Sequence, residues 1–159
     1  MDALFNADND ELLPRTYGDD FALEAVRLYA KCWNTLSVEP IEPLLADDVV
    51  YESQLILTPL VGKSVLVEYL KNKMATIAKA GPRSEVFAEL GYCGGQAGQR
   101  VQLLTAEIGR PCVLFAQGDK EVPKLLVLLE ITGQKIKRID LCTQVPHPSS
   151  AERTGEYPR

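Results

Sequence analysis

The last apolar segment of the chain, residues 135–143, carries side chains whose spacing could support acid–base chemistry. Arg138 and Asp140 are two positions apart in a strand-like stretch and therefore share one face. If that face lines a pocket, Asp140 is a proton acceptor that could activate water, with Arg138 as its charge partner. If Ile139 and Leu141 take the interior instead, the two charged residues form a surface pair. We favour this second arrangement because the apolar side chains need burial.

A thiol and an imidazole occur near the same end of the chain, at Cys142 and His147. They are five residues apart across a Val-Pro step, and no helix or strand geometry would bring them together as a nucleophile and base. We therefore interpret His147 as a solvated tail residue. The sequence has one histidine and no Cys-x-x-Cys, so we expect no metal site. We expect reduced cysteines, most of them buried, at Cys32, Cys93, Cys112 and Cys142.

The glycine-rich segment 91–100 does not have the pattern of a phosphate-binding loop. It leads into a strand-like run and not into a helix whose first amides could hold phosphate, so we interpret it as a hairpin loop. No cofactor is expected. A group of lysines is interpreted as the solvated side of one helix: Lys63, Lys71, Lys73 and Lys79.

The composition is that of one soluble domain. The chain has 159 residues, 46% of them hydrophobic and 25% charged, and a domain of this size hides roughly 70% of its surface on folding. Its 17 basic and 22 acidic residues give a net charge of −5, which argues against nucleic acid or an anionic membrane as the partner. The acidic amino terminus does not resemble a signal peptide, so we expect a cytoplasmic protein.

The elements that must position these residues are helices first and strands afterwards. We expect a flexible arm over residues 1–18, a domain over 19–145 and an irregular tail over 146–159. Apolar residues three and four apart predict a helix from Asp19 or Asp20 to Leu36, and Pro40 allows a short second helix over 38–45. A strand over 49–54 and a helix from Gly62 or Ser64, stopped by Gly81-Pro82, follow. Further strands are predicted over 84–91, 101–108, 111–118, 124–131 and 135–143. The short connections between them suit antiparallel hairpins, so the helices are followed by a meander and the fold class is α+β.

This order of elements resembles the nuclear transport factor 2-like fold. The stretch YAKCWNTLSVEPIEPLLADDVVYES, residues 29–53, is similar without a gap to ketosteroid isomerases and SnoaL-like polyketide cyclases. The segments GKSVLVEYL and QKIKRIDLC continue the match, which covers about residues 20–144. The resemblance implies a cystatin-like α+β barrel, in which a curved antiparallel mixed sheet forms a cone around three helices with a pocket at its open end.

The same resemblance assigns candidate catalytic positions. Tyr29 falls where the isomerases keep a tyrosine that donates a hydrogen bond to the developing oxyanion. Ser53 stands in place of their general base, an aspartate, and Val127 in place of their second oxyanion donor. Because serine is a poor acceptor for a carbon-bound proton, Tyr29 is the donor of this set and Ser53 a polar contact in the pocket. The residues that the resemblance directs toward a ligand, unless they simply fill the cone, are Trp33, Tyr51, Tyr69, Val127, Leu129 and Leu141.

The outer face of the sheet predicts a partner. If Ser53 points inward, strand alternation also turns Val127 and Leu129 inward, which leaves Leu126 and Leu128 on the outside. Two leucines in one outward row are more than a monomer usually leaves exposed, so we expect a homodimer through this face.

Three functions remain open from the sequence. The first is a small protein whose cone holds an apolar or aromatic molecule, as a binding protein or as a cofactor-free isomerase, cyclase or lyase. The second is a non-catalytic dimerisation or protein-interaction module with a cone packed shut. The third is water activation by Asp140 with Arg138, as in epoxide hydrolases of this fold. An open pocket of roughly 300 Å³ or more would favour ligand binding.

Overall fold

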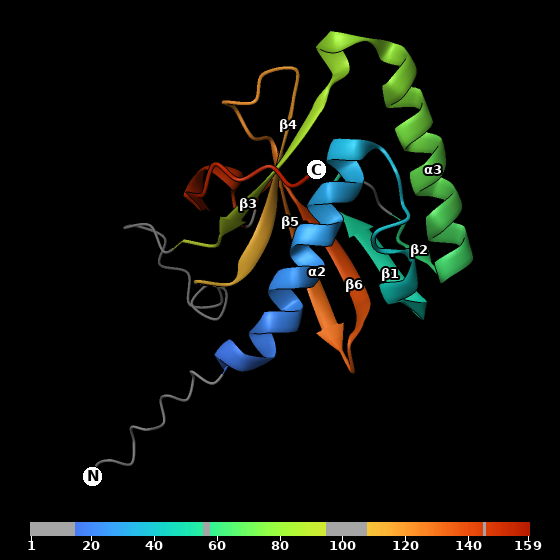
Figure 1. Cartoon of the computed structure of the whole chain (residues 1–159), viewed down its shortest axis with the longest axis vertical. Coiled ribbons are helices and arrows are strands. Elements are labelled where there is room, and N and C mark those ends of the chain that lie inside the picture. The colour runs from blue at the N-terminus through green and yellow to red at the C-terminus, as the bar shows by residue number, and fades with distance from the viewer. Residues whose placement is uncertain (1–14, 56–57, 95–107, 145) are drawn as a thin grey trace.

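The computed structural model describes residues 15–55, 58–94, 108–144 and 146–159, with side chains from residue 20 onward. In these ranges two α-helices, α2 (Arg15–Thr35) and α3 (Lys63–Ala80), pack on a seven-stranded mixed sheet (Figure 1). Helix α2 contacts the strands of one half of the sheet and α3 contacts β1 and β2. The α+β class predicted from the sequence is confirmed.

The helices differ from the prediction at two points. Helix α2 begins at Arg15 and not at Asp19 or Asp20, and it ends where Leu36 adopts a positive φ of 55°. The predicted helix over 38–45 is wrong: only a 3-10 turn, η1 (Glu42–Leu44), forms in the described structure there, because two prolines lie within this short stretch. Helix α3 is predicted almost to the residue, since Gly62 and Gly81 flank it with positive φ values that favour glycine. A second 3-10 turn, η2 (Pro82–Ser84), follows at once.

The sheet has the strand order β2-β1-β6-β5-β4-β3-β7 and is open at β2 and β7, so it does not close into a barrel. Its strands are β1 (Leu45–Ser53), β2 (Leu60–Val61), β3 (Val86–Tyr92), β4 (Pro111–Gln117), β5 (Leu125–Thr132), β6 (Lys135–Cys142) and β7 (Glu152–Arg153). Among the described strands, β1 and β6 are the only pair that runs parallel; the other neighbours are antiparallel. The predicted strand over 101–108 lies outside the described residues except for Ile108. Strand β3 pairs directly with β4, a step that the predicted meander did not contain.

The two faces of the sheet carry separate apolar clusters, as strand alternation predicts. Val127 and Leu129 belong to the inner core under the helices, together with Val49, Tyr51 and Ile139. The outer cluster consists of Cys93, Cys112, Leu114, Leu126, Leu128 and Cys142, with Ala151 of the tail packed against it.

Leu126 and Leu128 lie on the outer face as predicted, but they are 0% and 6% exposed within the single chain. The outer face is therefore covered within the chain itself, and the structure gives no support for a second copy as its cover. All four cysteines are buried, and their sulfurs are thiols. A hydrogen bond with Cys93 and burial raise the pKa of Cys112 above its usual range, and burial raises the pKa of Cys32 to about 12.

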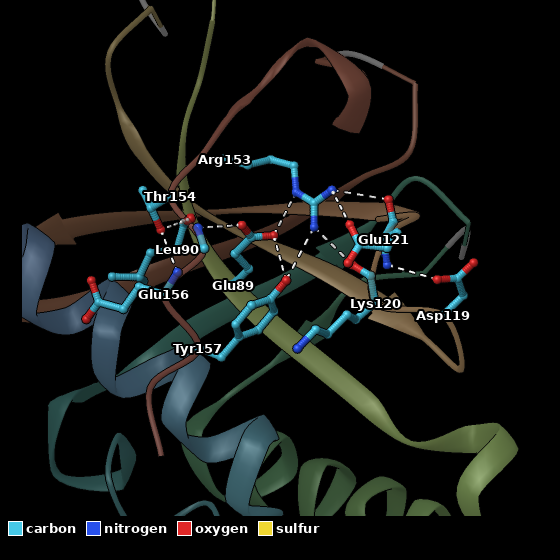
Figure 2. Close-up of polar contacts among 10 residues, drawn as sticks. Glu89, Leu90, Asp119, Lys120, Glu121, Arg153, Thr154, Glu156 and Tyr157 are labelled. Carbon is cyan, nitrogen blue, oxygen red and sulfur yellow. Dashed lines mark hydrogen bonds and ion pairs between the residues drawn. The ribbon is translucent and has the colours of Figure 1, made fainter.

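The carboxyl-terminal tail packs on the sheet. It contains a 3-10 turn, η3 (Pro148–Ser150), and the edge strand β7 that pairs with β3. Glu89 of β3, a carboxylate only 2% exposed, accepts hydrogen bonds from Arg153 Nε at 2.9 Å and from the Gly155 amide at 2.7 Å (Figure 2). The Tyr157 hydroxyl lies 3.3 Å from the same carboxylate. The buried carboxylate of Glu89 is thus one of the contacts that fasten the tail to the sheet.

Within the described ranges, neither α2 nor α3 nor any shorter helix combines the length and apolar character that a bilayer span requires.

Candidate functional site

A pocket of about 600 Å³ opens between α3, η2 and the inner face of β4 and β5. Helix α2 supplies one wall, and β1 and β6 supply part of the floor. The described residues that line it are Tyr29, Trp33, Tyr51, Lys73, Thr76, Ile77, Ala80, Arg83, Ser84, Val86, Phe115, Ala116, Gln117, Lys124, Leu125, Val127 and Leu141. The cone is therefore not packed shut, and the volume falls in the range of small-molecule sites.

Aromatic rings form the inner wall of this pocket. The rings of Tyr29, Trp33 and Phe115 pack edge to face or tilted, with centroids 5.4–6.5 Å apart. Tyr51 stacks on Tyr69 with a centroid distance of 5.5 Å. Such packing holds each ring in one orientation, so the wall presents fixed shapes to a ligand.

The position of α2 against the sheet is set by the residue next to Trp33. The Asn34 side chain donates to the Ala88 carbonyl and accepts from the Ala88 amide, each at 2.8 Å. Its Nδ2 also donates to the Pro158 carbonyl at 2.8 Å, which joins the tail to the same point. The Asn34 side-chain amide thus makes the same pair of hydrogen bonds to the β3 backbone that a neighbouring strand would make. These bonds fix the position of α2, the helix that carries Tyr29 and Trp33, against the sheet.

The wall carries hydrogen-bond donors. Burial raises the pKa of Tyr29 and of Tyr51 above the usual phenol range, so both hydroxyls stay protonated at physiological pH. Burial raises the pKa of Tyr29 more than a side-chain hydrogen bond with Trp33 lowers it, so the buried Trp33 Nε1 atom lies beside this hydroxyl.

The mouth of the pocket is cationic. Lys73 stands on α3 in the same row as Ile77 and Ala80, positions that lie on one face of a helix. Arg83 comes from η2, and Lys124 enters β5 with its amide bonded to the Phe115 carbonyl at 2.7 Å. We predicted that Lys73 belongs to the solvated side of its helix; it is exposed, but it also borders the pocket.

Two contacts hold the η2 side of the mouth against the end of β4. Gln117 Nε2 donates to the Ser84 carbonyl at 3.2 Å, and the Gly118 amide donates to the Glu85 carbonyl at 2.8 Å. A Cβ atom added at Gly118 would lie 2.8 Å from the Arg83 carbonyl oxygen, so glycine permits this close approach.

None of the described lining residues is an aspartate, glutamate, histidine or cysteine. The pocket therefore offers donors and cations but no side chain with the pKa of a general base at neutral pH. This arrangement can bind and polarise a ligand oxygen, but it has no described group that removes a proton from carbon.

The structure brings together most, but not all, of the predicted site. Tyr29, Trp33, Tyr51, Val127 and Leu141 line the pocket as the resemblance implied. Leu129 is buried in the core and Tyr69 packs behind Tyr51, so neither lines it.

Ser53 does not share the pocket with Tyr29. Its hydroxyl accepts the Leu55 amide at 3.0 Å, and the side chain is 6% exposed and absent from the lining. The expected meeting of Tyr29 and Ser53 in one hollow is therefore wrong; the hydroxyl stabilises the turn after β1 instead.

Arg138 and Asp140 take the outward arrangement that we favoured. Arg138 pairs with Asp140 at 2.9 Å and with Glu52 of the neighbouring strand, while Ile139 is fully buried on the inner face. Hydrogen bonds to Asp140 and to Glu52 raise the pKa of Arg138 above its usual range. Asp140 is absent from the pocket lining, so the interpretation in which it activates water there is wrong.

His147 is exposed, and its ring accepts the Ser149 amide at 3.1 Å, which caps η3. This agrees with a tail residue and not with a catalytic base. Among the described residues no group of three or more His, Cys, Asp or Glu side chains is arranged to hold a metal ion.

Comparison with solved structures identifies the fold. A SnoaL-like protein of unknown function from Burkholderia thailandensis E264 superposes with a TM-score of 0.51 at 15% identity, over 86% of this chain and 96% of that chain. An NTF-2 like protein of unknown function from Burkholderia xenovorans LB400 gives a TM-score of 0.49 at 10% identity, over 78% of this chain and 83% of that one. A LEH-like epoxide hydrolase from M. tuberculosis gives 0.47 at 13% identity, over 77% and 81%.

No protein-family model and no curated protein matches the sequence. The chain has the nuclear transport factor 2-like fold, with the curved sheet that the sequence resemblance implied. At these identities the likeness concerns the fold alone, and one such fold supports many activities.

Proposed function

We propose that this protein binds a small molecule with an apolar or aromatic body in the pocket between α3 and the inner face of the sheet. The single observation that carries the proposal is an open pocket of about 600 Å³ whose inner wall is built of the aromatic rings of Tyr29, Trp33 and Phe115. Tyr29 and Tyr51 stand in this wall as protonated phenols.

The pocket favours binding over proton-transfer catalysis. An isomerase or cyclase that forms an enolate needs a base to remove a proton and donors to stabilise the oxyanion. The described lining supplies donors, and it has no carboxylate or imidazole that could serve as the base. We therefore infer a binding protein, with Tyr29, Trp33 and Phe115 as its aromatic contacts and Val127 and Leu141 as its aliphatic ones.

The test uses a neutral fluorescent probe, N-phenyl-naphthylamine (NPN), whose emission rises in apolar surroundings. Ala80 is exposed on α3 and lines the pocket, so Ala80→Phe should fill the mouth without disturbing the core. Ala75 is exposed on the same helix but lies outside the pocket, which makes Ala75→Phe the matched control. We expect NPN to bind the wild-type chain and Ala75→Phe with equal affinity and Ala80→Phe at least about 10-fold more weakly. Equal binding by both variants, or failure of the wild type to bind both NPN and its anionic relative anilinonaphthalene sulfonate, would contradict the proposal.

A further inference from the structure

We propose that the ligand is an organic anion, whose apolar body lies along the aromatic wall and whose charged group lies at the mouth between Lys73, Arg83 and Lys124. This inference rests on the proposed function and adds the charge of the ligand to it. The three cations come from three separate segments, α3, η2 and the start of β5, and they converge on one opening.

The charge at the mouth is opposite to the charge of the whole protein. Acidic residues outnumber basic ones by 22 to 17 in the chain, yet the described lining contains three basic side chains and no acidic one. A solvated surface of this protein would carry both signs with an excess of acid. The net charge of the lining is therefore positive while that of the whole chain is negative, and a positive lining attracts an anion.

These cations are not neutralised by neighbours. None of Lys73, Arg83 and Lys124 forms an ion pair with an acidic side chain in the described ranges, whereas Arg27, Lys137, Arg138 and Arg153 each do. Lys73 Nζ lies 5.9 Å from the centre of the Tyr69 ring, a contact that leaves its protons free to reach an anion. Glu85 follows η2 closely in sequence, but it lines the neighbouring cleft and not this pocket.

The two ends of the pocket suit the two ends of such a ligand. At the inner end, Trp33, Tyr29 and Phe115 offer ring surfaces in a dry environment. At the outer end, a planar carboxylate or sulfonate could accept two parallel hydrogen bonds from the Arg83 guanidinium and a further one from either lysine. A neutral ligand would use the inner end and leave the outer end without a role.

The experiment compares two probes that differ by one charged group: anilinonaphthalene sulfonate (ANS) and its neutral parent NPN. Each is titrated into the full chain at low and at high salt concentration. A triple variant replaces Lys73, Arg83 and Lys124 with glutamine, which keeps polarity and removes charge. The control replaces Lys63, Lys71 and Lys79 with glutamine; it loses the same net charge, and none of its three positions lines the pocket.

We expect the wild-type chain to bind ANS more tightly than NPN and to lose part of that preference at high salt. The pocket-mouth triple variant should bind ANS about 10-fold more weakly and NPN within about 2-fold of wild type, since each exposed charge contributes a modest share. The control variant should bind both probes as wild type does. Equal affinity for the two probes, or equal losses in the two triple variants, would overturn the anion assignment while leaving the pocket in place. Failure of both probes to bind the wild type would overturn the proposed function itself.

Discussion

The buried carboxylate of Glu89 makes the docking of the tail testable. Its hydrogen-bond partners, Arg153 Nε, the Gly155 amide and the Tyr157 hydroxyl, can all donate. Glu89→Gln keeps the shape but puts an NH2 group where one carboxylate oxygen was, so one donor faces another donor. A hydrogen bond to a charged group contributes about 1.5–3 kcal/mol. With one such bond lost and the others weakened, we expect the free energy of unfolding to fall by about 3 kcal/mol.

The assay is thermal unfolding followed by circular dichroism. A loss of this size in a chain of this length should lower Tm by about 9 °C. Glu130→Gln is the control, since Glu130 is an exposed glutamate on β5. We also expect trypsin to cleave after Arg153 faster in Glu89→Gln, because the loosened tail opens more often. A Tm within 1–2 °C of wild type, roughly the scatter of a surface substitution, would refute the claim that this charge helps to fasten the tail.

Two further perturbations probe the wall of the pocket and the outer face. Burial raises the pKa of Tyr29 in the folded chain, so the unfolded chain releases the phenol proton at a lower pH. The contribution of Tyr29 to the free energy of unfolding is therefore complete below pH about 10. It declines as the pH rises beyond this value, by up to about 1.4 kcal/mol per pH unit. Denaturant unfolding at alkaline pH should therefore show a smaller decline in Tyr29→Phe, and an unchanged slope would count against a buried phenol. A Cβ atom at Gly94 would lie 2.4 Å from the Ser150 carbonyl oxygen, so Gly94→Ala should cost about 1–3 kcal/mol of unfolding free energy, whereas a neutral effect would show that the tail does not lie there.

The sequence predicts the fold well wherever one short-range rule decides the structure. Two glycines bound α3, and the alternation in β5 places Val127 inside and Leu126 outside, as observed. It fails where distant residues decide. The tail docks on Glu89, whose partner Arg153 is 64 positions away. A lone acidic residue between Ala88 and Leu90 in an apolar strand was the available signal, but it did not say which cation would meet it.

The candidate site was predictable in its aromatic half and not in its cationic half. The resemblance aligned Tyr29, Trp33 and Tyr51 because they sit in one ungapped stretch, and the structure places all three in the pocket wall. Arg83 and Lys124 come from a turn and a loop end whose approach depends on contacts between segments far apart in sequence. Ser53 was assigned by position alone, and the local turn took its hydroxyl instead.

The central claim, that a ligand occupies the wall around Trp33, can be measured on one atom. Trp33 is the only tryptophan in the chain, so its indole N–H gives a single identifiable peak in a proton–nitrogen correlation spectrum. Because Trp33 lines the pocket, a ligand bound there should change the surroundings of its indole ring and move this peak strongly. We predict a saturable shift on titration with ANS that follows the fluorescence affinity and disappears in Ala80→Phe. An unmoved Trp33 peak in a protein saturated with the probe would contradict the account.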